Sequence, residues 1–116
     1  MSPSSGRDWR LYAEDIVTAC GKVRRFVAGM AYEAVVTDER TQDAVMRNLE
    51  IIGEAAKNIP DEVFAGAPEI HWRNIRGMRD VLAHGYFGMS LPIVWATATT
   101  RIDEVEAAIT KILSHP

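Results

Sequence analysis

The sequence predicts an all-α protein, an up-and-down bundle of four to five helices. Apolar residues recur at steps of three and four residues in several separate segments, which is the spacing of one face of an α-helix. No alternation with a period of two extends beyond a few residues, so a sheet is not indicated. The 116 residues, 47% hydrophobic and 25% charged, suit one globular domain.

The first two helices follow from two apolar stripes. The first stripe predicts a helix over residues 9–30 that ends near Gly29 and consists of Trp9, Tyr12, Ile16, Cys20, Val23, Val27 and Met30. The second consists of Val45, Leu49, Ile52, Ala56 and Ile59. We expect Thr37, Asp38 or Thr41 to cap this helix and Pro60 to end it, because the residue before a proline avoids the α region. Residues 34–37 are predicted to form a loop rather than a brief extended piece.

The second half of the chain contains one short and two long helical segments. Residues 60–68 can form a short helical turn that begins at a proline with acids beside it. The third main helix is expected from about Pro68 to His84 and has Ile75, Met78 and Leu82 on its apolar face. Ser90 can cap the fourth, whose stripe is Val94, Ala98, Ile102, Val105, Ile109 and Ile112. The threonines at 97, 99 and 100 are mediocre helix formers, so packing must hold that stretch.

Composition and charge limit the function classes. We expect residues 1–7 to be a disordered N-terminus and residues 8–114 to form the helical domain. Thirteen basic against sixteen acidic residues give a net charge of −3, which argues against a broad basic nucleic-acid surface but not against a narrow cleft. The single cysteine, Cys20, allows no intrachain disulfide, and its place on the first apolar stripe predicts that it is buried in the core. No apolar run reaches the roughly 18 residues that span a bilayer, so we expect a cytoplasmic protein with no membrane partner.

The polar residues that could carry chemistry are concentrated between His71 and Tyr86. Arg73, Arg76 and Arg79 recur every three residues and form a ridge that could grip phosphate groups. The alternative is a solvated face whose ion pairs involve Glu50, Glu54 or acids of the fourth helix, and the pattern alone favours it. Neither reading requires a metal or a cofactor, and the sequence offers no ligand set for a metal.

Asp80 and His84 are four residues apart, so the carboxylate can bond to the imidazole and fix its tautomer. Arg79 and His84 are five apart, which places them about 140° apart around a helix with about 7.5 Å of rise. They can share a cleft if Arg79 reaches around the helix or if a second chain brings its own copy.

The run over residues 77–87 resembles the signature of the HEPN superfamily, and most closely its DUF86 branch of HepT-like toxins. That signature is Arg, a polar residue, three further residues, His, any residue and Tyr, and it is matched here by Arg79, Asp80, His84 and Tyr86. Residues 47–55, 68–72 and 94–95 also resemble family segments, so the resemblance spans most of residues 9–113.

The resemblance implies a homodimer of helical bundles in which two Arg/His motifs share one cleft, and a metal-independent ribonuclease activity. It also implies a partner, a minimal nucleotidyltransferase of the MNT type. This is the antitoxin of a toxin–antitoxin pair, and it would adenylylate Tyr86. An AMP group there adds negative charge and bulk beside the arginines and would exclude an RNA phosphate. Without the family, Tyr86 reads as a packing residue.

The expected reaction uses the ribose 2′-OH as nucleophile. His84 would move protons, Arg79 would hold the scissile phosphate and Asp80 would orient His84, giving a 2′,3′-cyclic phosphate and a 5′-OH. Arg73 and Arg76 are weaker candidates for binding RNA phosphate. Arg47, Glu50 and Glu54 share a helix face and either line the cleft or are simply solvated. Two alternatives remain: a non-catalytic nucleotide- or substrate-binding partner of a nucleotidyltransferase, and an interaction domain whose basic ridge is structural.

Overall fold

The structure is a computed structural model that describes residues 7–83 and 90–115. Within these ranges the chain forms helices and no strand, so the predicted all-α class is confirmed. The elements are α1 (Trp9–Val27), α2 (Tyr32–Val36), α3 (Glu39–Lys57), α4 (Asp61–Phe64), α5 (Trp72–Ala83), α6 (Leu91–Ala96), a π-helical turn η2 (Thr97–Arg101) and α7 (Ile102–Leu113). None of these helices is long and apolar enough to cross a membrane.

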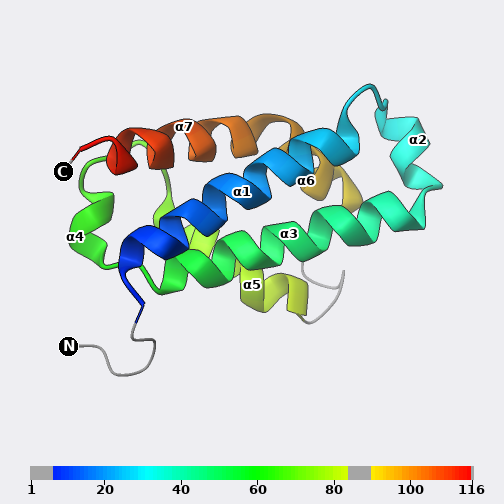
Figure 1. Cartoon of the computed structure of the whole chain (residues 1–116). Coiled ribbons are helices and arrows are strands. Elements are labelled where there is room, and N and C mark those ends of the chain that lie inside the picture. The colour runs from blue at the N-terminus through cyan, green and yellow to red at the C-terminus, as the bar shows by residue number, and fades with distance from the viewer. Residues whose placement is uncertain (1–6, 84–89, 116) are drawn as a thin grey trace.

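The long helices lie side by side in a bundle (Figure 1). α3 runs opposite to α1, and α7 also runs opposite to α1. The main packing contacts join α1 to α3, α3 to α5 and α1 to α7. This order makes α3 the shared support of α1 on one side and α5 on the other, and the candidate site depends on that arrangement.

The predicted apolar stripes form the core. The second stripe is buried in full along α3 and its end, and Cys20 on α1 is completely buried. Asp38 caps α3, because its carboxylate accepts a hydrogen bond from the Thr41 amide at 3.1 Å. Gly29 follows α1 with φ of +75°, a left-handed conformation that favours glycine. The start of α3 at the Asp38 cap and the end of α1 just before Gly29 thus follow the capping and glycine signals in the sequence.

The loop prediction for residues 34–37 was wrong, because residues 32–36 form the short helix α2. Two contacts hold this turn despite its β-branched residues. Gln42 donates hydrogen bonds to the carbonyls of Val35 and Val36, at 2.7 and 3.1 Å, and so satisfies its C-terminal end. Tyr32 packs edge-on against Trp95 of α6, with 6.2 Å between ring centroids.

The third main helix begins at Trp72 rather than near Pro68. The Trp72 side chain explains the later start, because its Nε1 donates to the Ala67 carbonyl at 2.9 Å and its ring stacks on Phe64 at 4.0 Å. These contacts hold the residues between Ala67 and Trp72 in turns and fasten α4 to the start of α5.

The fourth predicted helix is divided by the π-helical turn. The hydroxyls of Thr97 and Thr99 donate to the carbonyls four residues earlier, at 2.9 and 2.8 Å, a bond that competes with regular helix geometry. Ala98 is buried in the middle of this turn, which agrees with the expectation that packing holds the threonine-rich stretch.

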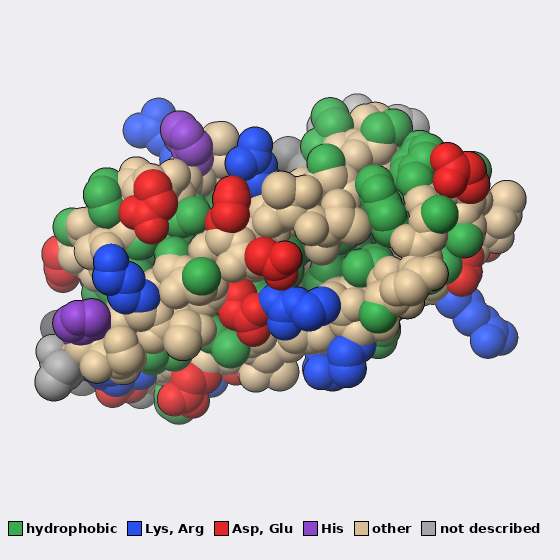
Figure 2. Space-filling model, turned by 90° about the horizontal axis from the view of Figure 1, so that it is seen from above, with side chains coloured by type: hydrophobic (Ala, Val, Ile, Leu, Met, Phe, Trp, Pro, Cys, Tyr) green, Lys and Arg blue, Asp and Glu red, His purple; other side chains and the backbone are tan. Residues whose placement is uncertain are grey.

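One face of the molecule shows how the charge is distributed (Figure 2). Acidic and basic side chains are interspersed on it, without a broad basic area. Apolar side chains gather at the end that carries α2 and α6, where Val36 and Ile93 are 46% and 55% exposed.

Candidate active site

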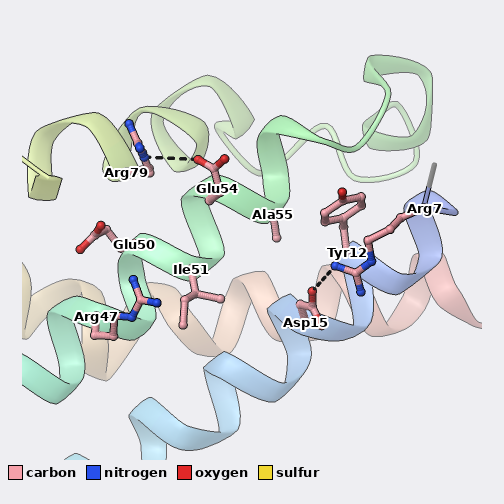
Figure 3. Close-up of a pocket in the computed structure, with 9 residues that line it drawn as sticks. All are labelled: Arg7, Tyr12, Asp15, Arg47, Glu50, Ile51, Glu54, Ala55 and Arg79. Carbon is pink, nitrogen blue, oxygen red and sulfur yellow. Dashed lines mark hydrogen bonds and ion pairs between the residues drawn. The ribbon is translucent and has the colours of Figure 1, made fainter. Parts of the chain in front are cut away.

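A polar pocket of about 410 Å³ lies between α1, α3 and α5 (Figure 3). It is lined by Arg7, Tyr12, Asp15, Arg47, Glu50, Ile51, Glu54, Ala55 and Arg79. Arg79, predicted to be catalytic, therefore borders the same pocket as Arg47, Glu50 and Glu54, for which the sequence left open whether they line a cleft or are simply solvated. The pocket forms because α3 presents one face to both neighbouring helices.

Arg79 reaches the pocket from α5 and is held by two carboxylates. Its Nε lies 3.3 Å from Glu54 Oε2 across the helix pair, and its Nη1 lies 3.3 Å from Asp80 Oδ1. The Nη2 group makes no contact among the described residues, and the side chain is 45% exposed. The guanidinium is thus oriented by its neighbours while keeping donors for an incoming anion.

The main chain of Arg79 rests directly on α3. A Cβ atom built on Gly53 would lie 2.8 Å from the Arg79 nitrogen and 3.0 Å from the Ile75 carbonyl oxygen. Only a residue without a side chain lets the two helices approach this closely. Gly53 therefore sets the depth at which Arg79 enters the pocket.

Asp80 is shared between two cations. Lys57 Nζ lies 2.9 and 3.0 Å from its two carboxylate oxygens, and Arg79 approaches one of them. Hydrogen bonds from Lys57 lower the pKa of Asp80 below its ordinary value, partial desolvation opposes this, and Arg79 adds a smaller decrease. Asp80 is thus an anion at neutral pH. His84, which it was predicted to orient, and Tyr86, the predicted modification site, both lie outside the described residues.

The predicted arginine ridge of α5 is divided. Arg76 is turned to the end of α3, where it donates to the carbonyls of Ala56 and Ile59 and pairs with Asp61. Arg73 is exposed, and its side chain has no hydrogen bond or ion pair among the described residues. Neither residue lines the pocket that contains Arg79.

Three kinds of contact in this site were missed from the sequence. Lys57 stands three residues after Glu54 on the same helix, so extending that face by one step would have found it. A glycine inside a helical stripe, here Gly53, is a signal of close backbone approach. Arg7 and Asp15, which pair at 3.0 Å on the far side of the pocket, carried no sequence signal.

Other reactive groups are not part of the site. Burial raises the pKa of the Cys20 thiol to about 12, so it is not a nucleophile at neutral pH. Within residues 7–83 and 90–115, no three His, Cys, Asp or Glu side chains are grouped as metal ligands.

The fold and the site define a helical-bundle protein with an arginine and an aspartate paired beside a polar pocket. The chain belongs to the Ribonuclease HepT-like family. The family model matches residues 16–112, from the middle of α1 to the end of α7.

Relatives of the chain carry ribonuclease names. It is 40% identical over 106 residues to a Thermococcus cleftensis protein named "Probable ribonuclease HepT", covering 91% of this chain and 96% of the relative. It is 40% identical over 104 residues to a protein of Caldanaerobacter subterraneus named as a candidate RNase, with 90% and 93% covered. A Methanocaldococcus jannaschii protein with a similar name is 36% identical over 107 residues, with 92% of each chain covered. No solved structure matches the chain at a significant level.

Proposed function

We propose that the protein is a metal-independent endoribonuclease that acts as the toxin of a toxin–antitoxin pair. The observation that carries the proposal is Arg79, held by Glu54 and Asp80 at the edge of a polar pocket, in a chain of the Ribonuclease HepT-like family. A guanidinium fixed in this way is suited to stabilise negative charge that develops on a phosphate.

In the proposed reaction the 2′-hydroxyl attacks the adjacent phosphorus, and the bond from phosphorus to the 5′-oxygen breaks. The proton of the 2′-hydroxyl passes to a base, and the 5′-oxygen receives a proton as it leaves. The products are a 2′,3′-cyclic phosphate and a 5′-OH. His84 serves this proton transfer, Arg79 binds the scissile phosphate, and Asp80 orients His84. Lys57 donates hydrogen bonds to both carboxylate oxygens of Asp80 and helps to fix its position.

The proposed active form is a homodimer, in which a second copy brings its own motif to the cleft. The exposed apolar side chains at one end of the bundle support this pairing, because Phe26, Val36 and Ile93 would be covered by a second chain. Light scattering of the purified protein tests it, and Ile93→Asp should shift the mass toward that of the monomer.

The proposed antitoxin is a nucleotidyltransferase of the MNT type. It would transfer AMP from ATP to the Tyr86 hydroxyl, with release of pyrophosphate, and the added phosphate would repel RNA from Arg79. Mass spectrometry after co-expression should show one AMP adduct that is absent from Tyr86→Phe. An adduct that persists in this variant would refute the assignment of Tyr86.

The decisive experiment is RNA digestion in EDTA by the wild type, Arg79→Ala and His84→Ala. We expect the wild type to leave cyclic phosphate ends and both variants to lose most cleavage. Cleavage that requires added Mg²⁺, or a fully active His84→Ala, would contradict the mechanism. Binding of RNA or nucleotide without cleavage would instead support the non-catalytic partner of a nucleotidyltransferase. Arg7 and Arg79 both line the pocket, and each is oriented by a carboxylate. Two oriented arginines could hold the phosphates of a nucleotide without cleaving it, as that alternative function requires.

A further inference from the structure

Two arginines that line the pocket, Arg7 and Arg47, have no part in the proposed reaction. Arg47 lies on α3 seven residues before Glu54, which places it on nearly the same helix face and about 10.5 Å away along the axis. Glu54 in turn holds Arg79. The two guanidinium groups therefore border one pocket at two positions along α3 (Figure 3).

The three arginines of the pocket differ in their pairing. Arg7 is bound to Asp15 at 3.0 Å, and Arg79 is bound to Glu54 at 3.3 Å. The exposed Arg47 makes no hydrogen bond and no ion pair among the residues that the structure describes. All its donors are therefore available to an anion that enters the pocket from solvent.

We propose that Arg47 binds a phosphate of the RNA next to the one that is cut, so that the strand crosses α3 from Arg79 toward Arg47. The inference rests on the proposed ribonuclease function and adds the course of its substrate. The nucleotide between the two phosphates occupies the pocket, whose volume of about 410 Å³ is in the range of sites that hold small organic ligands.

The spacing of Arg73, Arg76 and Arg79 would instead lead the RNA strand along α5. Arg76, the middle arginine of that ridge, is bound to two main-chain carbonyls and to Asp61. Releasing it to bind phosphate would break its hydrogen bonds to the carbonyls of Ala56 and Ile59 and its pair with Asp61. Arg47 can bind phosphate without breaking any contact, so the strand is directed across α3.

Glu50 tests the same path of the RNA, because removing its charge should have the opposite effect on RNA binding to removing the charge of Arg47. It lies three residues after Arg47, lines the pocket and makes no ion pair among the described residues. Its carboxylate would repel a phosphate held at Arg47. Removing its charge should therefore strengthen RNA binding, whereas removing the charge of Arg47 should weaken it.

The experiment measures binding of a short single-stranded 2′-O-methyl RNA, which cannot be cut, by fluorescence anisotropy over a range of salt concentrations. Arg47→Ala should weaken binding roughly tenfold and reduce the slope of log K against log salt by about 0.7, the value for one phosphate contact on a single strand. Glu50→Gln should strengthen binding about twofold. Lys111→Ala is the control, because it removes a positive charge from α7, which does not line this pocket.

Cleavage of ordinary RNA by the same variants separates this inference from the proposed function. Arg47→Ala should raise KM and leave kcat near the wild-type value, because the contact binds substrate and transition state equally. If the wild type cuts RNA but Arg47→Ala behaves like Lys111→Ala, the subsite is wrong and the ribonuclease stands. If binding depends on Arg47 but no RNA is cut, the proposed ribonuclease is wrong, and what stands of the inference is that Arg47 binds an RNA phosphate, without its place next to a cut. Loss of a dimer in Arg47→Ala, detected by light scattering, would overturn the subsite by assigning Arg47 to a protein interface.

Discussion

Arg76 and Arg79 lie three residues apart on α5, and both guanidinium groups face the C-terminal half of α3. Arg76 meets main-chain oxygens there. Its Nε donates to Ala56 O at 3.1 Å and its Nη2 to Ile59 O at 2.8 Å, while Asp61 pairs with Nη1 at 2.6 Å. Its side chain is 27% exposed, so it forms part of the join between α3, α4 and α5.

Arg79, one turn further along, meets carboxylates instead. Glu54 and Asp80 hold two of its nitrogens at 3.3 Å, and the side chain is 45% exposed beside the pocket. The carbonyls at the end of α3 need donors that the helix itself cannot supply, and Arg76 fills that need. Carboxylates in water have no such need, so Arg79 remains available to a ligand. The oxygens that lie opposite therefore decide whether an arginine of α5 joins helices, as Arg76 does, or stays open to a ligand, as Arg79 does.

The largest expected difference between the two arginines is in activity. Arg79→Ala should lower kcat/KM for RNA by about 10²–10³-fold, because in the proposed mechanism it removes the charge that stabilises the transition state. It should change the free energy of unfolding by less than about 0.5 kcal/mol, since its ion pairs are exposed. Kinetics and urea unfolding of one preparation measure both. A strongly destabilised Arg79→Ala would show that the contrast with Arg76 is wrong.

The next largest effect is expected at Gly53, which sets the contact between α3 and the main chain of Arg79. Gly53→Ala should destabilise the fold by about 3 kcal/mol, because the new methyl group meets main-chain atoms that cannot rotate away. Gly77→Ala on α5 is the matched control. A Cβ there meets nothing within 4 Å, so it should stabilise the helix by about 0.5–1 kcal/mol. Urea unfolding would contradict the close approach if both substitutions had the same sign.

Arg76→Ala should cost about 2 kcal/mol of folding free energy. The substitution removes the Arg76 hydrogen bonds to the carbonyls of Ala56 and Ile59 and the pair with Asp61, while Ala56 keeps a bond from the Ile59 amide. Arg73→Ala, on the same helix without such contacts, should lie within about 0.5 kcal/mol of the wild type. Thermal unfolding compares the two, and equal melting temperatures would show that Arg76 does not stabilise the end of α3.

The contrast also shows what could be predicted from the sequence. The buried residues of α3 could be predicted one by one, because the apolar residues that recur with the helical period are the ones that face the core. The shared face of Arg47, Glu50 and Glu54 was predictable for the same reason. The division of the arginine ridge was not, because it depends on where the end of α3 lies relative to α5. His84 remains a prediction.

Local helix propensity failed to predict α2, because side chains from outside the segment determine its conformation. Residues 34–37 were predicted to form a loop, and β-branched residues such as Val35 and Val36 have a lower helix propensity. The amide of Gln42 and the ring of Trp95, both outside that segment, hold it as α2. Contacts of this kind have no periodicity in the sequence, so a pattern of residues cannot reveal them.

The smallest expected effect concerns the carboxylate that helps hold Arg79. Hydrogen bonds from Lys57 lower the pKa of Asp80, so Lys57→Met should raise it toward the ordinary value of about 4. Because the folded-state pKa is the lower one, the contribution of Asp80 to stability is present above about pH 4 and is lost as the pH falls through the folded-state pKa. NMR titration of labelled aspartate carboxyl groups measures the shift. Lys111→Met, which removes a lysine that does not contact Asp80, should leave the titration unchanged. An unchanged Asp80 pKa in Lys57→Met would contradict the assignment of this pKa shift to Lys57.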